Sequence, residues 1–287
     1  MNAPARPTPA APLVAALAAV ALLAACAWFF VGTRRGQVGD EIALRGATIG
    51  TWRWSTQAEA LLQTVSVGAV AVALAVVVVV GLAAGRPRAA LVGAAVIGAA
   101  NVTTQVVKNV LVTRPDLIAG DHTANSLPSG HTTVAASIVV GLALVAGRRA
   151  VPLVTGVGAA VVTAFGYATL VNQWHRPSDV VAAVLVACAW GYVGEAALRA
   201  GPRPPQPTSR RRPARRPAGA GPSAGWGLVA AGGLALGVAV VAVALMWGVG
   251  LDDATRLQRL VAHVGGSAAL AGVTCSGLGV LARLRSA

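Results

Sequence analysis

The fold class is decided by stretches such as LLQTVSVGAVAVALAVVVVVGLAA at residues 61–84, which contains no charged side chain over 24 residues. A transmembrane helix needs roughly 20 apolar residues to cross the hydrocarbon core of a bilayer. The stretch lacks the alternation of apolar and polar residues that a membrane β-strand requires, and an open sheet in lipid would leave backbone groups unpaired. It therefore predicts a transmembrane helix.

Seven further apolar blocks surround this one, and the whole chain is 56% hydrophobic and only 11% charged, which is the composition of a membrane protein. We predict an all-α fold, a polytopic transmembrane bundle with a six-helix core followed by two additional C-terminal spans. The predicted spans are residues 12–32, 61–84, 89–112, 131–147, 151–173, 179–199, 224–250 and 262–282.

A Pro- and Arg-rich segment at 201–223 cannot bury a core and is predicted to be a basic cytoplasmic linker. It divides the chain into a first span with an outer loop (1–59), a core (60–200) and a two-span C-terminal segment (224–287). The arginines of the linker either fix the topology or attract anionic lipid head groups.

The net charge of +14 is interpreted as a topology signal and not as a nucleic-acid-binding surface. With the N-terminus inside, fourteen of the 23 basic residues lie in cytoplasmic segments and nine lie on the other side. The sequence thus predicts a multi-pass plasma-membrane protein with both termini in the cytoplasm. The outer loop at 33–60 could carry interfacial tryptophans or cover a site as a lid.

Polar residues are costly at membrane depth, so the places where they gather are candidate functional sites. Asn101, Thr104 and Lys108 are three or four residues apart, which places them on one face of the third span. Arg114 follows next to a proline that ends the helical pattern, and it can therefore reach into the loop. Lys108 and Arg114 are candidate anion ligands.

The fourth span is preceded directly by Pro-Ser-Gly-His at 128–131. Ser129 and Gly130 would open the helix, where backbone N–H groups and the positive end of the helix dipole favour an anion such as phosphate. His131 would lie beside that anion.

The third gathering of polar residues is Trp-His-Arg-Pro-Ser-Asp at 174–179, before the sixth span. His175 and Asp179 are four residues apart, so the carboxylate can bond to one imidazole nitrogen and leave the other free. A histidine held in this way can act as a base or a nucleophile. A metal site built from Asp121, His122, His131, His175 and Asp179 is an alternative, but it lacks a recognised ligand spacing.

In these motifs the chain resembles the type 2 phosphatidic acid phosphatases, whose superfamily includes the vanadium haloperoxidases. The resemblance covers residues 60–200. It implies that His175 attacks phosphorus, that Asp179 orients His175, and that His131 protonates the leaving alcohol. Lys108, Arg114, Ser129 and the Gly130 backbone would hold the phosphoryl oxygens, and no metal or other cofactor would be needed.

Two positions depart from the family pattern. Five residues separate Lys108 from Arg114 where the family has six, and Ala168-Thr169 stands where the family has Ser-Arg. The loss of one donor to a developing negative charge typically costs about 10²–10³ in rate. We hypothesise that Arg176, directly after the nucleophile, supplies the missing positive charge.

The resemblance implies a lipid phosphate phosphohydrolase whose substrate is a lipid phosphate or a polyprenyl phosphate or diphosphate. Its site would open on the outer face of the membrane. One alternative uses the same residues: a lipid or sugar phosphotransferase that passes the phosphoryl group to a hydroxyl. Another, prompted by the missing arginine, is a catalytically silent membrane protein that retains the scaffold and binds lipid. The oligomeric state cannot be predicted from the sequence.

Overall fold

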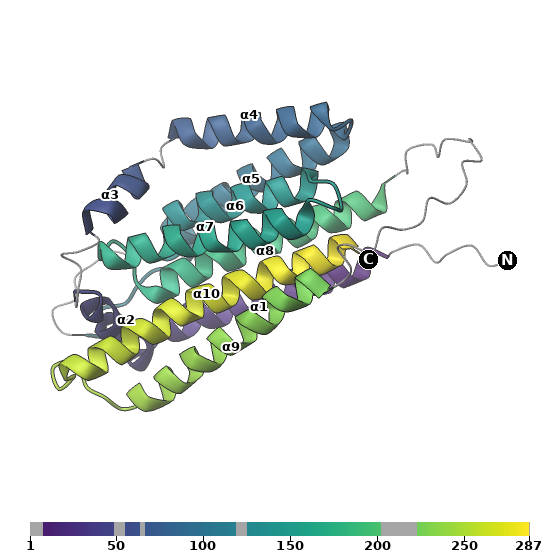
Figure 1. Cartoon of the computed structure of the whole chain (residues 1–287). Helices are drawn as coiled ribbons and strands as arrows, with labels where there is room; N and C mark the ends of the chain where they lie inside the picture. The colour runs from purple at the N-terminus through teal and green to yellow at the C-terminus, as the bar shows by residue number, and fades with distance from the viewer. Residues whose placement is uncertain (1–7, 49–54, 64–66, 119–124, 202–222, 287) are drawn as a thin grey trace, which may run out of the picture.

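The computed structural model describes residues 8–48, 55–63, 67–118, 125–201 and 223–286. All regular elements in these ranges are helical, which confirms the all-α fold (Figure 1). The elements are α1 (Ala10–Phe30), α2 (Arg34–Gly46), α3 (Ser55–Gln63), α4 (Val67–Ala83), α5 (Pro87–Val106), the π-helical turn η2 (Val107–Leu111), α6 (Gly130–Val145), α7 (Val151–Val171), α8 (Pro177–Ala200), α9 (Ser223–Met246) and α10 (Arg256–Ser286).

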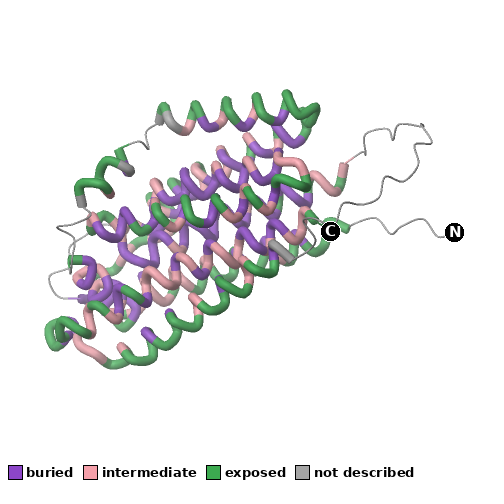
Figure 2. Tube along the Cα trace, in the orientation of Figure 1, coloured by how far each residue is buried: buried purple, intermediate pink, exposed green. Residues whose placement is uncertain are grey.

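Six of the described helices are long and apolar enough to cross a membrane: α1, α5 together with η2, α7, α8, α9 and α10. The other two predicted spans correspond to shorter apolar helices, α4 and α6. Much of α4 and α9 is exposed (Figure 2). Large apolar side chains are among the exposed residues, such as Val79 and Leu234, which are 63% and 77% exposed. Such surfaces are typical of helices that face lipid.

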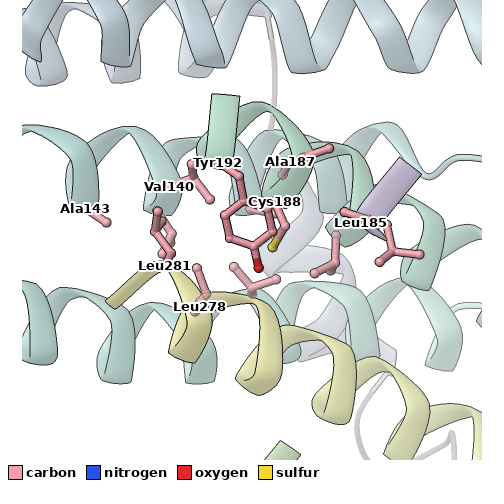
Figure 3. Close-up of a cluster of buried hydrophobic side chains, with 14 of the residues drawn as sticks. Val140, Ala143, Leu185, Ala187, Cys188, Tyr192, Leu278 and Leu281 are labelled. Atoms are coloured by element: carbon pink, nitrogen blue, oxygen red, sulfur yellow. The ribbon is translucent and has the colours of Figure 1, made fainter. Parts of the chain in front are cut away.

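The core lies where α8 packs against α6 on one side and against α10 on another. Val140 of α6, Leu185 and Tyr192 of α8 and Leu278 of α10 contribute to one buried cluster (Figure 3). The Tyr192 hydroxyl donates to the Gly277 carbonyl oxygen of α10 at 2.9 Å, so its polar end is satisfied within the apolar interior. The last helix, α10, is thus part of the bundle core.

The outer loop contains helices that the span prediction did not include, α2 and α3. α2 begins where the Thr33 hydroxyl accepts the Gly36 N–H at 3.0 Å, which satisfies one of the free donors of the first turn. Val38 and Ile42, four residues apart, are both buried and give α2 an apolar face. Trp52 and Trp54 lie outside the described residues.

The bundle has two chemically different ends (Figure 1). At one end the Arg199 Nη1 donates to the Thr8 carbonyl oxygen at 3.2 Å, and Arg285 pairs with Glu195 at 2.8 Å. These contacts bring the start of α1 to the ends of α8 and α10. The opposite end carries α2 and the N-termini of α6 and α8, where the predicted site residues lie.

Candidate active site

The nucleophile candidate lies in the turn that opens α8. The Asp179 Oδ2 lies 3.2 Å from the His175 Nδ1, and the two side chains are only 3% and 10% exposed. The same oxygen accepts the Arg176 backbone N–H at 3.0 Å. Because an ionised carboxylate only accepts hydrogen bonds, Nδ1 carries the proton in this pairing and Nε2 keeps its lone pair. The structure therefore forms the His175–Asp179 pair that the four-residue spacing predicted.

The Pro-Ser-Gly-His motif forms the start of α6, as predicted. Ser129 is the N-cap residue, and its hydroxyl oxygen accepts the Thr132 N–H at 3.4 Å. Its own N–H donates to the Asp179 carbonyl oxygen at 2.9 Å, which joins the openings of α6 and α8. The following N–H groups, on Gly130 and His131, have no acceptor within an α-helix and can serve an anion.

The structure is open beside the α-carbon of Gly130. A Cβ atom placed on this glycine would meet no other atom within 4 Å. The His131 ring lies next to the exposed Trp174 ring, with 5.5 Å between the ring centroids. Trp174 directly precedes His175, and the Thr104 hydroxyl of α5, one turn before Lys108, lies 2.9 Å from the Thr133 hydroxyl of α6. The structure thus brings residues of all three motifs together at the opening of α6.

Lys108 lies in η2, the single π-helical turn that ends the third predicted span. Such turns are rare and occur frequently at functional sites. The Asn125 amide fixes this end of the helix by donating to the carbonyl oxygens of Lys108 at 3.0 Å and Val112 at 2.9 Å. Arg114 follows η2 in a non-helical segment, and its side chain is partly buried.

Arg176 is placed differently from the predicted phosphate ligands. Its guanidinium Nη2 lies 3.5 Å from the Glu41 Oε2 of α2, and the two side chains are 6% and 15% exposed. A contact between Arg176 and phosphate stays a prediction, since part of the guanidinium charge is already paired. At the position of the missing family arginine, Thr169 is fully buried and its hydroxyl donates to the Gly166 carbonyl oxygen at 2.7 Å.

Two residues that the sequence did not single out support the pair. The Ser126 hydroxyl donates to the Asp179 Oδ2 at 2.6 Å, so this carboxylate oxygen has a third donor. The Asn125 side chain bonds on both sides: its amide nitrogen donates to the Lys108 and Val112 carbonyl oxygens, and its amide oxygen accepts the Leu127 N–H at 3.1 Å. Their position directly before the Pro-Ser-Gly-His motif could have predicted a structural role for Asn125 and Ser126, because small polar residues in such a loop often bond to neighbouring backbone groups.

The metal alternative lies partly outside the described residues, and a cavity between the helices lies apart from the predicted site residues. Asp121 and His122 lie outside the described residues, within which no group of three or more His, Cys, Asp or Glu side chains could hold a metal ion. A cavity of about 380 Å³ lies between α1, α2, α8, α9 and α10. Ser178 and Asp40 line it, but none of the eight predicted site residues does.

Comparison with known proteins agrees with this geometry. Residues 67–199 match the family model of the PAP2 superfamily, and all eight predicted site residues fall within this range. No curated protein and no solved structure matches the chain. The matched segment carries all three motifs on a membrane-type helical bundle, and the match is consistent with a member of the type 2 phosphatidic acid phosphatase superfamily.

Proposed function

We propose that this protein is a membrane lipid phosphate phosphohydrolase that works through a phosphohistidine on His175 without a metal. The observation that carries the proposal is the 3.2 Å contact between the His175 Nδ1 and the buried Asp179, which leaves the Nε2 lone pair free to attack phosphorus. The match of residues 67–199 to the PAP2 superfamily supports a phosphatase-type activity.

In the first step the His175 Nε2 attacks phosphorus and the bond from phosphorus to the alcohol oxygen breaks. His131 gives its proton to the departing alkoxide, and Asp179 stabilises the positive charge that the phosphorylated imidazole carries. In the second step His131 takes a proton from water, the water oxygen attacks phosphorus, and the phosphorus–nitrogen bond breaks. Inorganic phosphate leaves and His175 is restored.

The phosphoryl oxygens are assigned to Lys108, Arg114, Ser129 and the N–H of Gly130. Catalysis of phosphoryl transfer depends mainly on positioning and on neutralising the equatorial oxygens, which is what cationic side chains and a helix N-terminus provide. Arg176 is kept as a hypothetical further ligand, tested below.

A lipid phosphate is the proposed substrate because the site lies at one end of a membrane-type bundle. The opposite end gathers arginines such as Arg86, Arg199 and Arg285 at the ends of the helices. Since positive charge favours the cytoplasmic side, we place the site on the outer face of the plasma membrane, near the lipid head groups. Phosphatidate and polyprenyl phosphates or diphosphates are the candidates.

The test uses the full-length protein in detergent, offered a panel of lipid phosphates in the presence of EDTA. We expect phosphate release by the wild type and a loss of about 10³-fold or more in His175→Ala, because the nucleophile is removed. Radioactive phosphate should be trapped on His175 in a form that acid releases and base does not. Activity that requires a divalent metal, or that survives His175→Ala, would contradict the mechanism.

The buried Thr169, in place of a family arginine, favours one competing function, a catalytically silent lipid-binding protein. The same panel separates the two. Binding of a lipid phosphate without turnover, and without trapped phosphate on His175, would establish the silent protein. Transfer of the phosphoryl group to an added alcohol in place of water would identify a phosphotransferase.

A further inference from the structure

One face of α2 contacts the chain on both sides of the candidate site. α2 lies outside the segment that matches the family model, which begins at residue 67. Gln37, Asp40, Glu41 and Leu44 are spaced so that they share one helix face. Each of them makes a hydrogen bond or an ion pair to a residue close in sequence to Arg114 or His175, as the next paragraphs describe.

Asp40 bonds to the first turn of α8. Its Oδ1 accepts the Ser178 N–H at 3.1 Å, and the Ser178 hydroxyl donates to its Oδ2. The N–H groups of a first helical turn have no intrahelical acceptor, so Asp40 caps α8 from another helix. Asp40 is only 1% exposed. Burial raises the pKa of Asp40 to about 7, and nearby Asp179 adds to the rise.

Glu41 and Leu44 hold the residues that flank His175. The Glu41 Oε2 pairs with the Arg176 Nη2 at 3.5 Å, directly after the nucleophile. The Leu44 carbonyl oxygen accepts a hydrogen bond from the Gln173 Nε2 at 3.2 Å, two residues before it. The turn that carries His175 is therefore tied to α2 on both sides.

Gln37 holds the other loop. Its Nε2 donates to the Pro115 carbonyl oxygen at 2.8 Å and to the Val31 carbonyl oxygen at 2.8 Å. Pro115 directly follows Arg114, and Gln37 is only 1% exposed. The backbone next to the predicted phosphate ligand is thus anchored to the same helix as the nucleophile turn.

The remaining faces of α2 are supported by the C-terminal helices. Val38, Ile42 and Ala43 form a buried cluster with Leu251 and Ala262. A Cβ atom at Gly46 would lie 2.0 Å from the Arg259 carbonyl oxygen, so the two helices approach as closely as their backbones allow. α2 lies between the candidate site and α10.

We propose that α2 is a positioning element of the active site, in which Gln37, Asp40 and Glu41 fix the distance between Arg114 and His175. They are positioning residues, because each acts through another residue and touches no reacting atom. The inference rests on the proposed function. A displacement of about 1 Å between a nucleophile and the group it attacks can cost about 10²-fold in rate, which sets the expected size of the effect.

The first measurement compares Asp40→Ala, Asp40→Asn and the control Asp253→Asn in the full-length protein. Asp253 is an exposed aspartate in the α9–α10 loop. Asp40→Ala should lower kcat about 10²-fold while KM changes by less than about 3-fold, because the nucleophile is displaced and the phosphate ligands remain. Asp40→Asn should recover part of the loss, since its amide oxygen can accept the Ser178 N–H. The control should match the wild type.

The second measurement needs no substrate: the rate at which diethyl pyrocarbonate modifies His175, followed by mass spectrometry. The His175 side chain is 10% exposed and should react several-fold faster in Asp40→Ala, because its turn is released. If Asp40→Ala does not fold, Glu41→Gln, which keeps its shape and loses the ion pair with Arg176, takes its place in both measurements.

The two readouts separate failure of this inference from failure of the proposed function. An unchanged modification rate in the folded Asp40 or Glu41 variants would overturn the positioning role, whatever the activity. A faster rate in a protein whose wild type turns over no lipid phosphate would support the positioning role and count against the phosphohydrolase. The positioning role would also be overturned if kcat fell only in proportion to the amount of folded protein.

Discussion

Replacing Asp179 by asparagine tests the central contact of the proposed mechanism. The amide keeps the size of the carboxyl group, and its oxygen can still accept the Arg176 N–H and the Ser126 hydroxyl, so the start of α8 should stay folded. What is lost is the negative charge 3.2 Å from the His175 Nδ1. During phosphoryl transfer the imidazole becomes positively charged, and that charge would have no partner.

The magnitude follows from the geometry. At 3.2 Å, with an effective dielectric constant of about 20, a pair of unit charges attracts by about 5 kcal/mol, and burial of both side chains limits screening by solvent. One tenfold change in rate corresponds to about 1.4 kcal/mol, so the variant should lose about 10³–10⁴ in kcat. The same substitution in a Ser-His-Asp triad costs roughly 10⁴.

The assay is phosphate release from the best lipid phosphate of the panel, with kcat and KM measured separately and the melting temperature as a check of folding. KM should change by less than about 3-fold, since the phosphate ligands are untouched. The exposed Asp253→Asn serves as the matched control. A loss in kcat below about 10-fold in a folded Asp179→Asn variant would refute the role given to the carboxylate.

Three further predictions concern other parts of the site. Gly130→Ala should fold normally, because its Cβ meets no atom beyond the neighbouring backbone within 4 Å, but it should raise KM about 10-fold or more by entering the proposed phosphate site. The control Gly98→Ala, equally unobstructed, should leave KM unchanged and should not lower the melting temperature, because alanine is favoured over glycine inside a helix. Arg114→Ala should lower kcat/KM by about 10²–10³, because one phosphate ligand is lost. Arg176→Ala should show a similar loss if Arg176 also binds phosphate. An Arg176→Ala enzyme with unchanged kcat/KM would refute the hypothesis that Arg176 replaces the missing family arginine. The pKa of Asp40 is about 7 in the folded protein and about 4 for an aspartate in an unfolded chain. Between these two pH values the folded state binds more protons than the unfolded state. The free energy of unfolding should therefore fall as the pH rises from about 4 to 7. Melting temperatures of the wild type should therefore decline more steeply with pH than those of Asp40→Asn, and parallel curves would contradict the raised pKa of Asp40.

The parts of the site that the sequence predicted are those set by local spacing. His175 and Asp179 are four residues apart across a helix start, and Ser129 and Gly130 directly precede an apolar helix. Such arrangements are fixed by helix geometry and by the chemistry of helix ends, whatever surrounds them. The all-α bundle was predictable for a similar reason, since long apolar runs leave few alternatives to a membrane helix.

The residues that the sequence did not reveal depend on contacts between distant segments. Asp40 and Ser178 are 138 residues apart, and Glu41 and Arg176 are 135 apart. No local pattern pairs them, and α2 itself lies within a stretch that was interpreted as an outer loop. Thr33 as an N-cap, with Val38 and Ile42 one turn apart, was the signal that predicts this helix.

These distant contacts change how the C-terminal pair of helices is understood. α9 and α10 carry no recognisable motif, yet α10 packs against α7 and α8 of the core and also against α2. Since α2 contacts the loops of Arg114 and His175 with one face and α10 with another, a shift of α10 would move the site through α2. The segment that matches the PAP2 superfamily contains every predicted site residue, but by our proposal the spacing between Arg114 and His175 depends on helices on either side of that segment.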